Sequence, residues 1–461
     1  MVAKTYTVAF QGVDARLVEV QCAITPGLPA FSIVGLPDKA VAESRERVRG
    51  ALAAIGLALP PKRITINLAP ADLPKEGSHY DLPIALGLMA ACGAVAPDAL
   101  AGYCVIGELS LDGSITAVAG ALPAAMGANA LGKGLICPKA SGAEAAWASN
   151  EMNLLAPPNL LVLINHFKGL QTLPRPQPAL EKEPDALPDM AEIKGQESAK
   201  RALEVAAAGG HNFLMIGPPG AGKSMLARRL PSILPPLTAS EMLEVSMVHS
   251  MAGALSGGQM GRARPFRAPH HSASMAALVG GGTKPRPGEA ALAHLGVLFL
   301  DELPEFSPQA LDALRQPLED GVIHISRAAG NLSFPAKFVL IAAMNPCPCG
   351  FLNDNEKSCI CSPIQIVNYK KKISGPILDR IDLHIEVPRV KFDKLTSGGL
   401  GEDSQTIKKR VENARAVQRE RLKDEPFITN SEMSSEAVIR SIFCATRLTR
   451  CIYPPALIFG F

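Results

Sequence analysis

The sequence predicts an α/β protein built from more than one domain. A chain of 461 residues is longer than a single hydrophobic core usually fills. Residues 171–190 are rich in proline and charge, and they separate two regions that each carry strand-like and helix-like patterns. We therefore expect an α/β domain over residues 1–170, a linker over 171–190, a second α/β domain over 191–392 and a helical region over 393–461.

The first region, residues 1–170, is rich in alanine and glycine and is predicted to mix strands with helices. Residues 64–68 (Ile-Thr-Ile-Asn-Leu) have the composition of a strand, and residues 81–92 are apolar over a length that suits a helix. In the linker, five prolines prevent a continuous helix, and few large apolar side chains are available to fill a core.

The second region carries three short apolar runs that are predicted as central parallel strands, buried on both faces. These runs are residues 213–216, 297–300 and 339–343. A helix is expected over residues 196–208, where two glycines follow as a natural stop. Residues 405–423 also have helical spacing, and their many basic side chains are most simply a solvated face.

The composition excludes several classes of protein. The chain has 46 lysine and arginine residues and 43 aspartate and glutamate residues. Its net charge is therefore too small to favour a nucleic-acid or membrane partner, and any basic surface has to be local. The apolar stretches are shorter than the roughly 20 residues that span a membrane, and a signal-peptide pattern is absent from the start of the chain. The cysteine spacing is unlike that of a small secreted disulfide fold. We expect a cytoplasmic protein with no membrane partner.

An eight-residue glycine-rich segment follows the first apolar run and opens a helical stretch. This order of strand, loop and helix is the one that a triphosphate-binding loop requires. Glycines allow backbone N–H groups to surround an anion, Lys223 reaches the outer phosphates, and the hydroxyl of Ser224 is placed to bind Mg²⁺. The sequence therefore predicts that ATP and Mg²⁺ are bound by Gly217, Pro218, Pro219, Gly220, Ala221, Gly222, Lys223 and Ser224.

Polar residues follow the other two predicted strands. Asp301 and Glu302 come directly after the second strand, at the sheet edge where open parallel sheets bind ligands. We expect Asp301 to hold Mg²⁺ and Glu302 to polarise the water that attacks the γ-phosphate, because phosphoryl transfer depends on positioning and charge neutralisation. Asn345, after the third strand, suits a sensor of the γ-phosphate, although an asparagine before a proline also suits a turn.

Four cysteines form two C-x-C pairs that are nine residues apart. This spacing can bring four thiolates around one tetrahedral Zn²⁺ in a purely structural site. Free loop thiols are the alternative, and a disulfide pair is disfavoured in a reducing cytosol. Bound metal would stiffen the loop that follows Asn345. The candidate ligands are Cys347, Cys349, Cys359 and Cys361.

A cationic stretch with one aromatic ring lies between two glycine-rich segments of the second region. Arginines bind phosphates with a fork of donors and an aromatic ring stacks on an unpaired base, so such a loop suits contact with DNA of any sequence. Contact between subunits and a merely solvated loop are the alternatives, and a metal site is disfavoured because adjacent histidine side chains diverge on a strand. A predicted hairpin over 323–334 adds a second basic candidate. The candidate DNA contacts are Arg264, Arg267, His270, His271 and Arg327.

Taken together, these motifs resemble those of AAA+ ATPases of the magnesium-chelatase-like branch. The resemblance also rests on residues 374–383, Ser-Gly-Pro-Ile-Leu-Asp-Arg-Ile-Asp-Leu. Within that branch, residues 66–77, 264–274 and 280–282 are similar to segments of the ComM/YifB family. The resemblance implies a homo-hexameric ring that uses ATP and Mg²⁺ to move single-stranded or branched DNA, with branch migration during natural transformation as its role.

In such a ring the nucleotide lies between subunits, and the resemblance gives Arg380 a role in the neighbouring subunit's site. It matches the family position of an arginine finger, which neutralises charge on the departing phosphate. The alternative is that Arg380 pairs with Asp379 or Asp382 on its own surface, where ion pairs are common and weak.

The amino-terminal domain resembles the proteolytic domain of Lon proteases, an S5 domain 2-like α/β fold, through residues 81–85 and 107–113. Lon uses a serine and lysine pair. On this resemblance the nucleophile position holds Ile84 and the general-base position falls at or near Leu122, and neither side chain can attack a carbonyl or accept a proton. We expect no protease activity and interpret the domain as a module for oligomerisation or for guiding the substrate.

The last part of the chain departs from the resemblance. The family's lid continues through a helix with a second sensor arginine, whereas from Ala437 onward the chain has unpatterned apolar residues and a proline pair. We expect an incomplete lid over 393–461, where nothing around Arg447 or Arg450 favours a sensor role. Two other hypotheses share the nucleotide-binding core. They are a chelatase-type motor for a metal-inserting partner, and a nucleotide-binding scaffold with impaired hydrolysis.

Overall fold

The computed structural model describes residues 2–181, 187–282, 286–327, 330–354, 356–390, 401–425, 428–434 and 436–439, apart from the side chains of Ser256, Arg327 and Asn331. The chain forms two compact units. The first comprises Met1–Asp185, Pro236–Leu298 and Phe306–Phe338, and the second comprises Ala186–Pro235, Phe299–Glu305 and Val339–Phe461. Both units mix helices and strands, so the predicted α/β class is confirmed.

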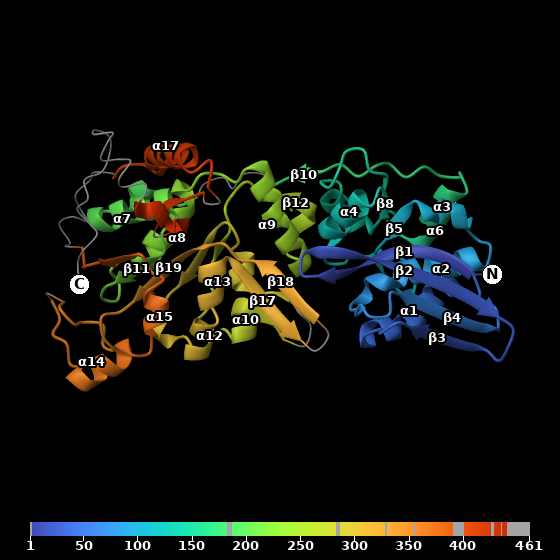
Figure 1. Cartoon of the computed structure of the whole chain (residues 1–461), viewed down its shortest axis with the longest axis horizontal. Coiled ribbons are helices and arrows are strands. Elements are labelled where there is room, and N and C mark those ends of the chain that lie inside the picture. Colours follow the sequence, from blue (N-terminus) through green and yellow to red (C-terminus); the bar gives the residue numbers. More distant parts are fainter. Residues whose placement is uncertain are drawn as a thin grey trace. The chain divides into compact units, whose positions relative to one another are not determined.

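A seven-stranded mixed sheet lies at the centre of the amino-terminal part of the first unit (Figure 1). In order across the sheet, its strands are β3 (Ala30–Val34), β4 (Arg63–Ala69), β2 (Asp14–Thr25), β1 (Val2–Gln11), β5 (Tyr103–Val105), β8 (Gly134–Ile136) and β9 (Leu154–Leu155). β1 and β2 form a long antiparallel hairpin, to which β4 adds antiparallel and β5 adds in parallel. The strand predicted over 64–68 is confirmed by β4.

Helices cover both faces of this sheet. The buried side chains of α1 (Lys39–Ala54) and α2 (Asp81–Ala91) share one hydrophobic core with β2 and β4. Small side chains of α4 (Ala121–Ala130) pack with β1, β5 and β8 in a second core. α2 is buried along nearly its whole length because its sequence is apolar on every side, which confirms the helix predicted over 81–92. The smaller elements of this part are α3 (Pro97–Ala101), β6 (Glu108–Leu109), β7 (Ile115–Thr116), α5 (Gly142–Ala145) and α6 (Leu160–Phe167).

A buried ion pair links the two helices on the first face. Asp81, at the start of α2, is fully buried, and Arg47 of α1 binds both of its carboxylate oxygens at 2.6 and 3.0 Å. The backbone N–H of Leu109 adds a third hydrogen bond at 3.1 Å. Burial raises the pKa of Asp81, while the hydrogen bonds from its partners oppose that rise. The carboxylate therefore depends on Arg47 for compensation of its lost hydration.

Replacing Arg47 by methionine should destabilise this part of the chain by about 3–5 kcal/mol, because the substitution leaves a buried carboxylate without its cation. Loss of hydrogen-exchange protection at the amides of α2 would measure the effect. Arg45→Met is the matched control, since Arg45 on the same helix is about half exposed and pairs with the exposed Glu46. Equal protection of α2 in both variants would contradict the dependence.

The later segments of the first unit carry the cationic stretch, which includes residues 264–271, and a hairpin. α9 (Ala239–Ala252) begins with a capping box of Thr238 and Glu241 and shares a small core with α4. β17 (Val322–Arg327) pairs with β18 (Gly330–Pro335), so the predicted hairpin is confirmed. The other elements here are β12 (Gln259–Met260), β13 (Phe266–Arg267), α10 (Met275–Val279), β14 (Gly280–Gly281), β15 (Arg286–Pro287), α11 (Glu289–Leu292), α12 (Pro308–Asp312) and α13 (Arg315–Asp320).

Part of the predicted linker is attached to the first unit. β10 (Ala179–Leu180) pairs in parallel with β12. Arg175 donates hydrogen bonds to the carbonyl oxygens of Ser149 and Met152. A two-residue bridge and a side-chain contact need neither a helix nor a core, so the prolines of the segment do not prevent them. Residues 182–186 lie outside the described part of the chain.

The second unit is built on a parallel arrangement of strands. In order across the sheet, these are the last two residues of β16 (Val297–Leu300), then β19 (Val339–Met344), β11 (Phe213–Ile216) and β20 (Leu383–Glu386). β11 pairs in parallel with both β19 and β20, and the first residues of β16 also pair with β13. The three predicted strands are confirmed. Because parallel strands end at the same edge, the residues after β11 and β19 are brought together.

Three helices pack around these strands, with α17 beside α7 and α8 (Figure 1). They are α7 (Glu197–Gly209), α8 (Lys223–Ile233) and α17 (Ser404–Arg421). Arg410 of α17 binds Glu204 of α7 at 2.7 Å, and Arg415 donates to the carbonyl oxygen of Ala207 at 2.8 Å. The basic side chains of α17 are thus not only a solvated face, because two of them attach this helix to α7. The remaining helices are α14 (Pro363–Lys370) and α15 (Gly375–Leu378).

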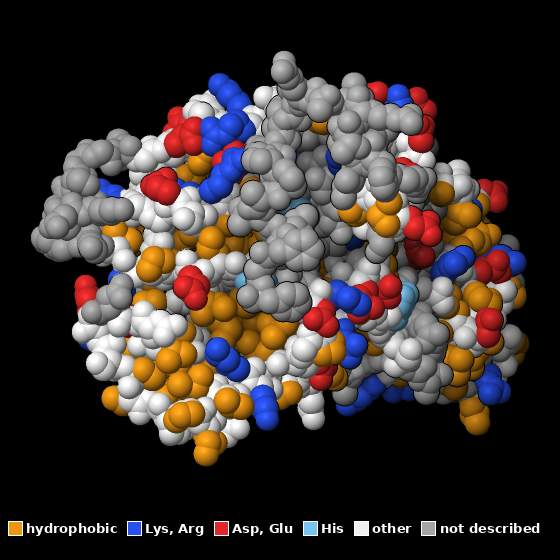
Figure 2. Space-filling model, turned by 60° about the vertical axis from the view of Figure 1, so that its left-hand side comes forward, with side chains coloured by type: hydrophobic (Ala, Val, Ile, Leu, Met, Phe, Trp, Pro, Cys, Tyr) orange, Lys and Arg blue, Asp and Glu red, His pale blue; other side chains and the backbone are white. Residues whose placement is uncertain are grey.

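Charged side chains of both signs are interspersed on the face of the molecule shown in Figure 2. This mixture agrees with the nearly balanced composition of 46 basic and 43 acidic residues. A surface of this kind favours local rather than global charge recognition. Within the described ranges, we find no helix that combines the length and the apolar character required to span a lipid bilayer.

Candidate nucleotide-binding site

The predicted glycine-rich loop connects β11 to α8. β11 ends at Ile216, and α8 begins at Lys223. Gly220 and Gly222 have φ angles of 78° and 92°, in the left-handed region that residues with side chains avoid. The chain therefore turns tightly here and leads directly into a helix N-terminus, whose first backbone N–H groups suit an anion.

Lys223 lies against this loop with its ammonium group surrounded by oxygen atoms. Its Nζ donates to the carbonyl oxygens of Gly217 at 2.7 Å and Pro218 at 3.0 Å, and to Oδ1 of Asn345 at 3.1 Å. The residue is 8% exposed, and this burial lowers the pKa of its ammonium group, while two nearby carboxylates raise it. A partly desolvated cation at the mouth of a glycine loop favours a phosphate group as partner.

The hydroxyl of Ser224 and the carboxylate of Asp301 lie side by side at the end of the sheet. Ser224 is on the first turn of α8, Asp301 follows β16, and Oγ donates to Oδ2 at 2.5 Å. Mg²⁺ prefers oxygen ligands, and one or two protein oxygens usually suffice because substrate phosphates and water complete its shell. These two residues therefore fit the ion that the sequence predicts.

Glu302, next to this pair, has an unusual backbone conformation. Its φ angle is 54° although it is not a glycine, and such a conformation costs on the order of 1–3 kcal/mol. Its N–H donates to Oδ1 of Asp301 at 3.0 Å, and its exposed side chain lines the same pocket. Backbone strain held by its surroundings is typical of functional sites. No sequence pattern indicated this conformation.

One pocket brings the predicted residues together. Its volume is about 380 Å³, within the range of small-molecule sites. Gly217 and Pro218 do not line it but hold Lys223 through their carbonyl oxygens. The lining consists of Pro219, Gly220, Ala221, Gly222, Lys223, Ser224, Met225, Asp301, Glu302, Met344 and Asn345. A basic loop, an acidic pair and an amide at the edge of one sheet form the arrangement that phosphoryl transfer requires.

Gln196 is a residue of this site that sequence reasoning missed. It precedes α7, and its side-chain amide donates to the carbonyl oxygen of Ala221 at 3.2 Å and to that of Pro388 at 2.5 Å. It thereby ties the phosphate loop to the segment after β20. A polar residue before a helix is common, so the sequence alone offers no signal that would single it out.

Arg380 lies at the opposite edge of the sheet from this pocket. It comes three residues before β20, whose first residue, Leu383, pairs with Phe213 at the start of β11. The phosphate loop begins only after the four residues of β11, which span about 13 Å at the usual rise per residue. The side chain of Arg380 is exposed and does not line the pocket of its own chain.

Asn212 fixes the segment that carries Arg380, and this residue was also missed. Its backbone N–H donates to Asp382 at 2.9 Å, and its side-chain amide donates to the carbonyl oxygen of Arg380 at 2.8 Å. Its Oδ1 accepts a hydrogen bond from the N–H of Leu340 at 2.8 Å. Asp382 is therefore engaged by the backbone of Asn212.

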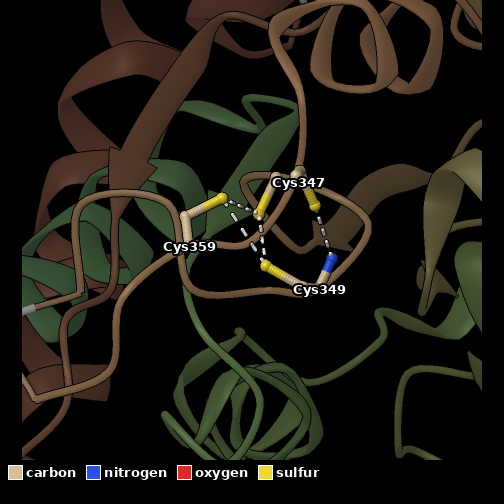
Figure 3. Close-up of side chains that lie close together, drawn as sticks. Cys347, Cys349 and Cys359 are labelled. Carbon is tan, nitrogen blue, oxygen red and sulfur yellow. Dashed lines mark hydrogen bonds between the residues drawn. The ribbon is translucent and has the colours of Figure 1, made fainter.

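The four predicted metal ligands converge on one point. Their sulfur atoms all lie within 4.8 Å of one another, and Figure 3 shows Cys347, Cys349 and Cys359 pointing toward one another. The Cys347–Cys349 sulfur distance is 3.4 Å, and Cys359 lies 3.6 Å from each of them. The backbone N–H of Cys349 donates to the sulfur of Cys361 at 3.3 Å. The spacing of two C-x-C pairs thus does bring the four thiols together.

The two candidate arginines of the cationic stretch, Arg264 and Arg267, are engaged within the chain. Arg264 donates to Glu241 at 3.1 Å and to the carbonyl oxygen of Leu295 at 2.7 Å. Arg267 binds Glu289 with two hydrogen bonds of 2.6 and 2.7 Å. Bidentate pairs of this kind compete with a phosphate for the same donors. Their proposed contact with DNA remains a prediction.

The adjacent histidines do not diverge, contrary to expectation. His270 and His271 lie in a loop rather than on a strand, and their ring centroids are 4.1 Å apart. His270 is exposed and is also held by Ser272, whose hydroxyl lies 2.8 Å from its Nδ1. The expected divergence holds only for extended backbone, in which successive side chains point to opposite faces.

The remaining residues that the sequence analysis discussed are either buried or outside the described part of the chain. The backbone of Arg327 ends β17, but its side chain lies outside the described residues. Ile84 and Leu122, to which the sequence resemblance assigned the two positions of the Lon pair, are fully buried in α2 and α4. Most of the atypical tail, including Arg447 and Arg450, also lies outside the described part.

Comparison with known proteins identifies the family. The family described as magnesium chelatase, subunit ChlI matches residues 189–395, and a second family, subunit ChlI of Mg-chelatase, matches residues 18–141. The competence protein ComM of Haemophilus influenzae is 46% identical over 425 residues, which are 91% of this chain and 83% of that protein. The chain belongs to the ComM/YifB family.

Two other relatives delimit the similarity. The YifB protein of Escherichia coli is 46% identical over 414 residues, 90% of this chain and 81% of its own length. The magnesium-chelatase 38 kDa subunit of Rhodobacter capsulatus is 30% identical over 171 residues, 33% of this chain and 49% of that protein. ComM/YifB proteins thus share nearly the whole chain, whereas the chelatase subunit shares a third of it.

Proposed function

We propose that the chain is an ATP-hydrolysing, ring-forming motor that acts on single-stranded or branched DNA and drives branch migration. One observation carries the nucleotide part of this proposal. Lys223, Ser224, Asp301, Glu302 and Asn345, which come from three separate segments, line a single pocket at the end of a parallel sheet. This is the edge at which open α/β sheets bind their ligands.

In the proposed reaction each residue has one task. Lys223 and the N–H groups at the start of α8 hold the phosphates, and Ser224 and Asp301 hold Mg²⁺, which neutralises charge between phosphate oxygens. Glu302 accepts a proton from the attacking water, and Asn345, already bound to Lys223, orients that water or the outer phosphate. In this proposal the second unit supplies every group for hydrolysis except a cation beside the departing phosphate.

A neighbouring copy of the chain would supply that cation. Arg380 is exposed and separated from its own pocket by the length of β11, which places it at the surface and away from its own nucleotide. Arginine fingers in trans raise phosphoryl-transfer rates by roughly 10³- to 10⁵-fold. This geometry favours a closed ring, in which every copy both receives and donates an arginine.

The DNA part of the proposal rests on the family and on the name of one relative. ComM of Haemophilus influenzae is named a competence protein. The charges visible in Figure 2 are mixed, so we expect contact through local groups. Examples are the exposed His270 and the β17–β18 hairpin, whose first strand ends at Arg327. Phosphate contacts of this kind weaken steeply as salt concentration rises.

Incubation of the full chain with ATP, Mg²⁺ and a labelled three-way DNA junction tests the function. We expect the junction to be resolved and ATP hydrolysis to rise when the junction is added. Lys223→Ala should abolish both, because it removes the cation that binds the phosphates. Lys39→Ala is the matched control, since the side chain of Lys39 is 92% exposed and forms only a weak contact with Glu43. Resolution that survives in Lys223→Ala would contradict the proposal.

A chelatase-type motor is the second candidate function. The observation that favours it is the 30% identity with the magnesium-chelatase 38 kDa subunit. Such a motor would hydrolyse ATP without any response to DNA and would instead respond to a metal-inserting partner. A nucleotide-binding scaffold, the third possibility, would bind ATP without turnover. Adding junction DNA to the ATPase assay separates all three.

A further inference from the structure

The four-cysteine cluster lies directly after Asn345 and has the geometry of a metal site. In a tetrahedral site with Zn–S distances of about 2.3 Å, the sulfur atoms are about 3.8 Å apart. The observed distances of 3.4 and 3.6 Å lie close to this value. All four sulfur atoms lie within 4.8 Å of one another, as the corners of a single coordination shell must.

Ordinary packing does not explain this convergence. Cys347 is buried, but Cys349, Cys359 and Cys361 are only half-buried. Burial of thiols away from water therefore does not explain why the four side chains lie together. Thiols are weak hydrogen-bond donors and acceptors, and four of them gain little from mutual contact. All four are free rather than paired in disulfides. A shared metal ion that prefers sulfur ligands would account for the arrangement.

The donor set selects the metal. Four sulfur ligands in a tetrahedral arrangement suit Zn²⁺, whereas Mg²⁺ and Ca²⁺ require oxygen ligands. Because the protein fills all four positions, such a site is structural and leaves no open position for a catalytic water. The backbone N–H of Cys349 also donates to the sulfur of Cys361 at 3.3 Å, a contact that orients a thiolate ligand.

The loop that bears these cysteines packs against the phosphate loop. Gly350 has a φ angle of 84°, and a β-carbon built on it would lie 2.5 Å from Cδ of Pro219. Only glycine permits this approach. At the near end of the same loop, Asn345 accepts a hydrogen bond from Lys223 at 3.1 Å. The segment 345–350 thus contacts the nucleotide pocket at two points.

The far end of the loop is fixed separately. Asp354 binds Arg389 at 2.8 Å, and the guanidinium carbon of Arg389 lies 5.5 Å from the ring centroid of Phe351. Arg389 follows closely on β20 in sequence. Cys347 and Cys349 lie between Asn345 and this anchor, and Cys359 and Cys361 lie beyond it, so contact among the four thiols joins the two sides of the anchor.

We propose that Cys347, Cys349, Cys359 and Cys361 bind one structural Zn²⁺, and that this ion keeps the loop from Asn345 to Gly350 against the phosphate loop. The first part is independent of the proposed function, whereas the second part rests on the nucleotide site described above. The zinc acts through Gly350 and Asn345 as a positioning element and contacts no substrate.

Metal analysis of the purified full chain tests the first part. We expect about one zinc per chain, loss of that zinc in Cys359→Ser, and full retention in Cys92→Ser, whose exposed thiol lies at the end of α2, outside the cluster. A chain purified without zinc that also takes up none when Zn²⁺ is added would overturn the proposal, as would stoichiometric iron.

Nucleotide binding tests the second part without reliance on turnover. Titration with a fluorescent ATP analogue should give an affinity about 10-fold weaker in Cys359→Ser and in chelator-treated protein. The first sample lacks one ligand of the zinc and the second lacks the zinc itself, so the loop from Asn345 to Gly350 loses its support in both. Gly350→Ala, which keeps all four thiols, should retain zinc and still weaken binding. If the unchanged chain contains zinc and all three samples bind the analogue with its affinity, the positioning role is refuted. Zinc present in a chain that binds no nucleotide would instead refute the proposed function.

Discussion

Replacing Glu302 by glutamine should slow ATP hydrolysis by about 100- to 10,000-fold and leave ATP affinity nearly unchanged, as expected for removal of a general base. Glutamine has the same length and can occupy the same position, but its amide cannot accept a proton. The pocket itself remains, since Lys223, Ser224 and Asp301 are untouched. Phosphate release at saturating ATP and equilibrium binding of ATP would measure the two quantities on the same samples.

Glu305→Gln is the matched control for this experiment. Glu305 lies three residues further along, is half exposed and pairs with Lys372 at 3.2 Å, but it does not line the pocket. It should therefore hydrolyse ATP at the rate of the unchanged chain. Full activity of Glu302→Gln would show that another group activates the water, whereas a parallel loss of affinity would show that Glu302 supports binding instead.

Replacing Arg380 by alanine should slow hydrolysis by about 10³-fold or more if Arg380 acts as an arginine finger. The physical reason is the loss of a fixed cation where negative charge develops on the departing phosphate. ATP binding to the isolated chain should not change, because Arg380 lies at the other edge of the sheet from the phosphate loop. Single-turnover hydrolysis together with ATP binding would measure both effects.

Mixing two inactive variants tests whether Arg380 acts between subunits. In an equal mixture of Arg380→Ala and Lys223→Ala chains, about a quarter of the interfaces in a closed ring combine an intact Lys223 with an intact Arg380. Hydrolysis should therefore return in the mixture although each variant alone is inactive. If Arg380 acted on the nucleotide of its own chain, the mixture would show no recovery, because no chain in it carries both an intact Lys223 and an intact Arg380.

The complementation depends on joint assembly, which can be followed separately. Chains with two different affinity tags should co-purify when mixed in the presence of ATP. Asp379→Asn, at the neighbouring exposed position, is the control for a change of charge at this surface. It should hydrolyse ATP at the normal rate, since a pair with Arg380 at this exposed site would be weak.

Several elements were predictable because their signals are local. The strands at 213–216, 297–300 and 339–343 and the phosphate loop are read from apolar runs and glycine spacing, and each is observed where it was expected. The pairing of two C-x-C motifs was also predictable, since the chain between them is short enough to bring the four thiols together. Such features depend on residues that are near one another in sequence.

Other features were not predictable because they depend on contacts between distant segments. Arg264 and Arg267 form a cationic stretch in the sequence, yet their partners Glu241 and Glu289 lie 23 and 22 residues away, and only folding reveals that the donors are engaged. The same holds for Gln196, whose partner Pro388 is 192 residues distant. Composition cannot show which charges are already neutralised.

By itself, the sequence determined the α/β class, the phosphate loop, the acidic pair and the cysteine pairs, because short-range spacing and backbone preference specify each of them. The tertiary structure decided that Asp301, Glu302 and Asn345 share a pocket with Lys223, that Gly350 contacts Pro219 and that Arg380 does not line the pocket of its own chain. The reason is that parallel strand pairing sets which residues meet at one sheet edge, and this pairing joins segments that are far apart along the chain.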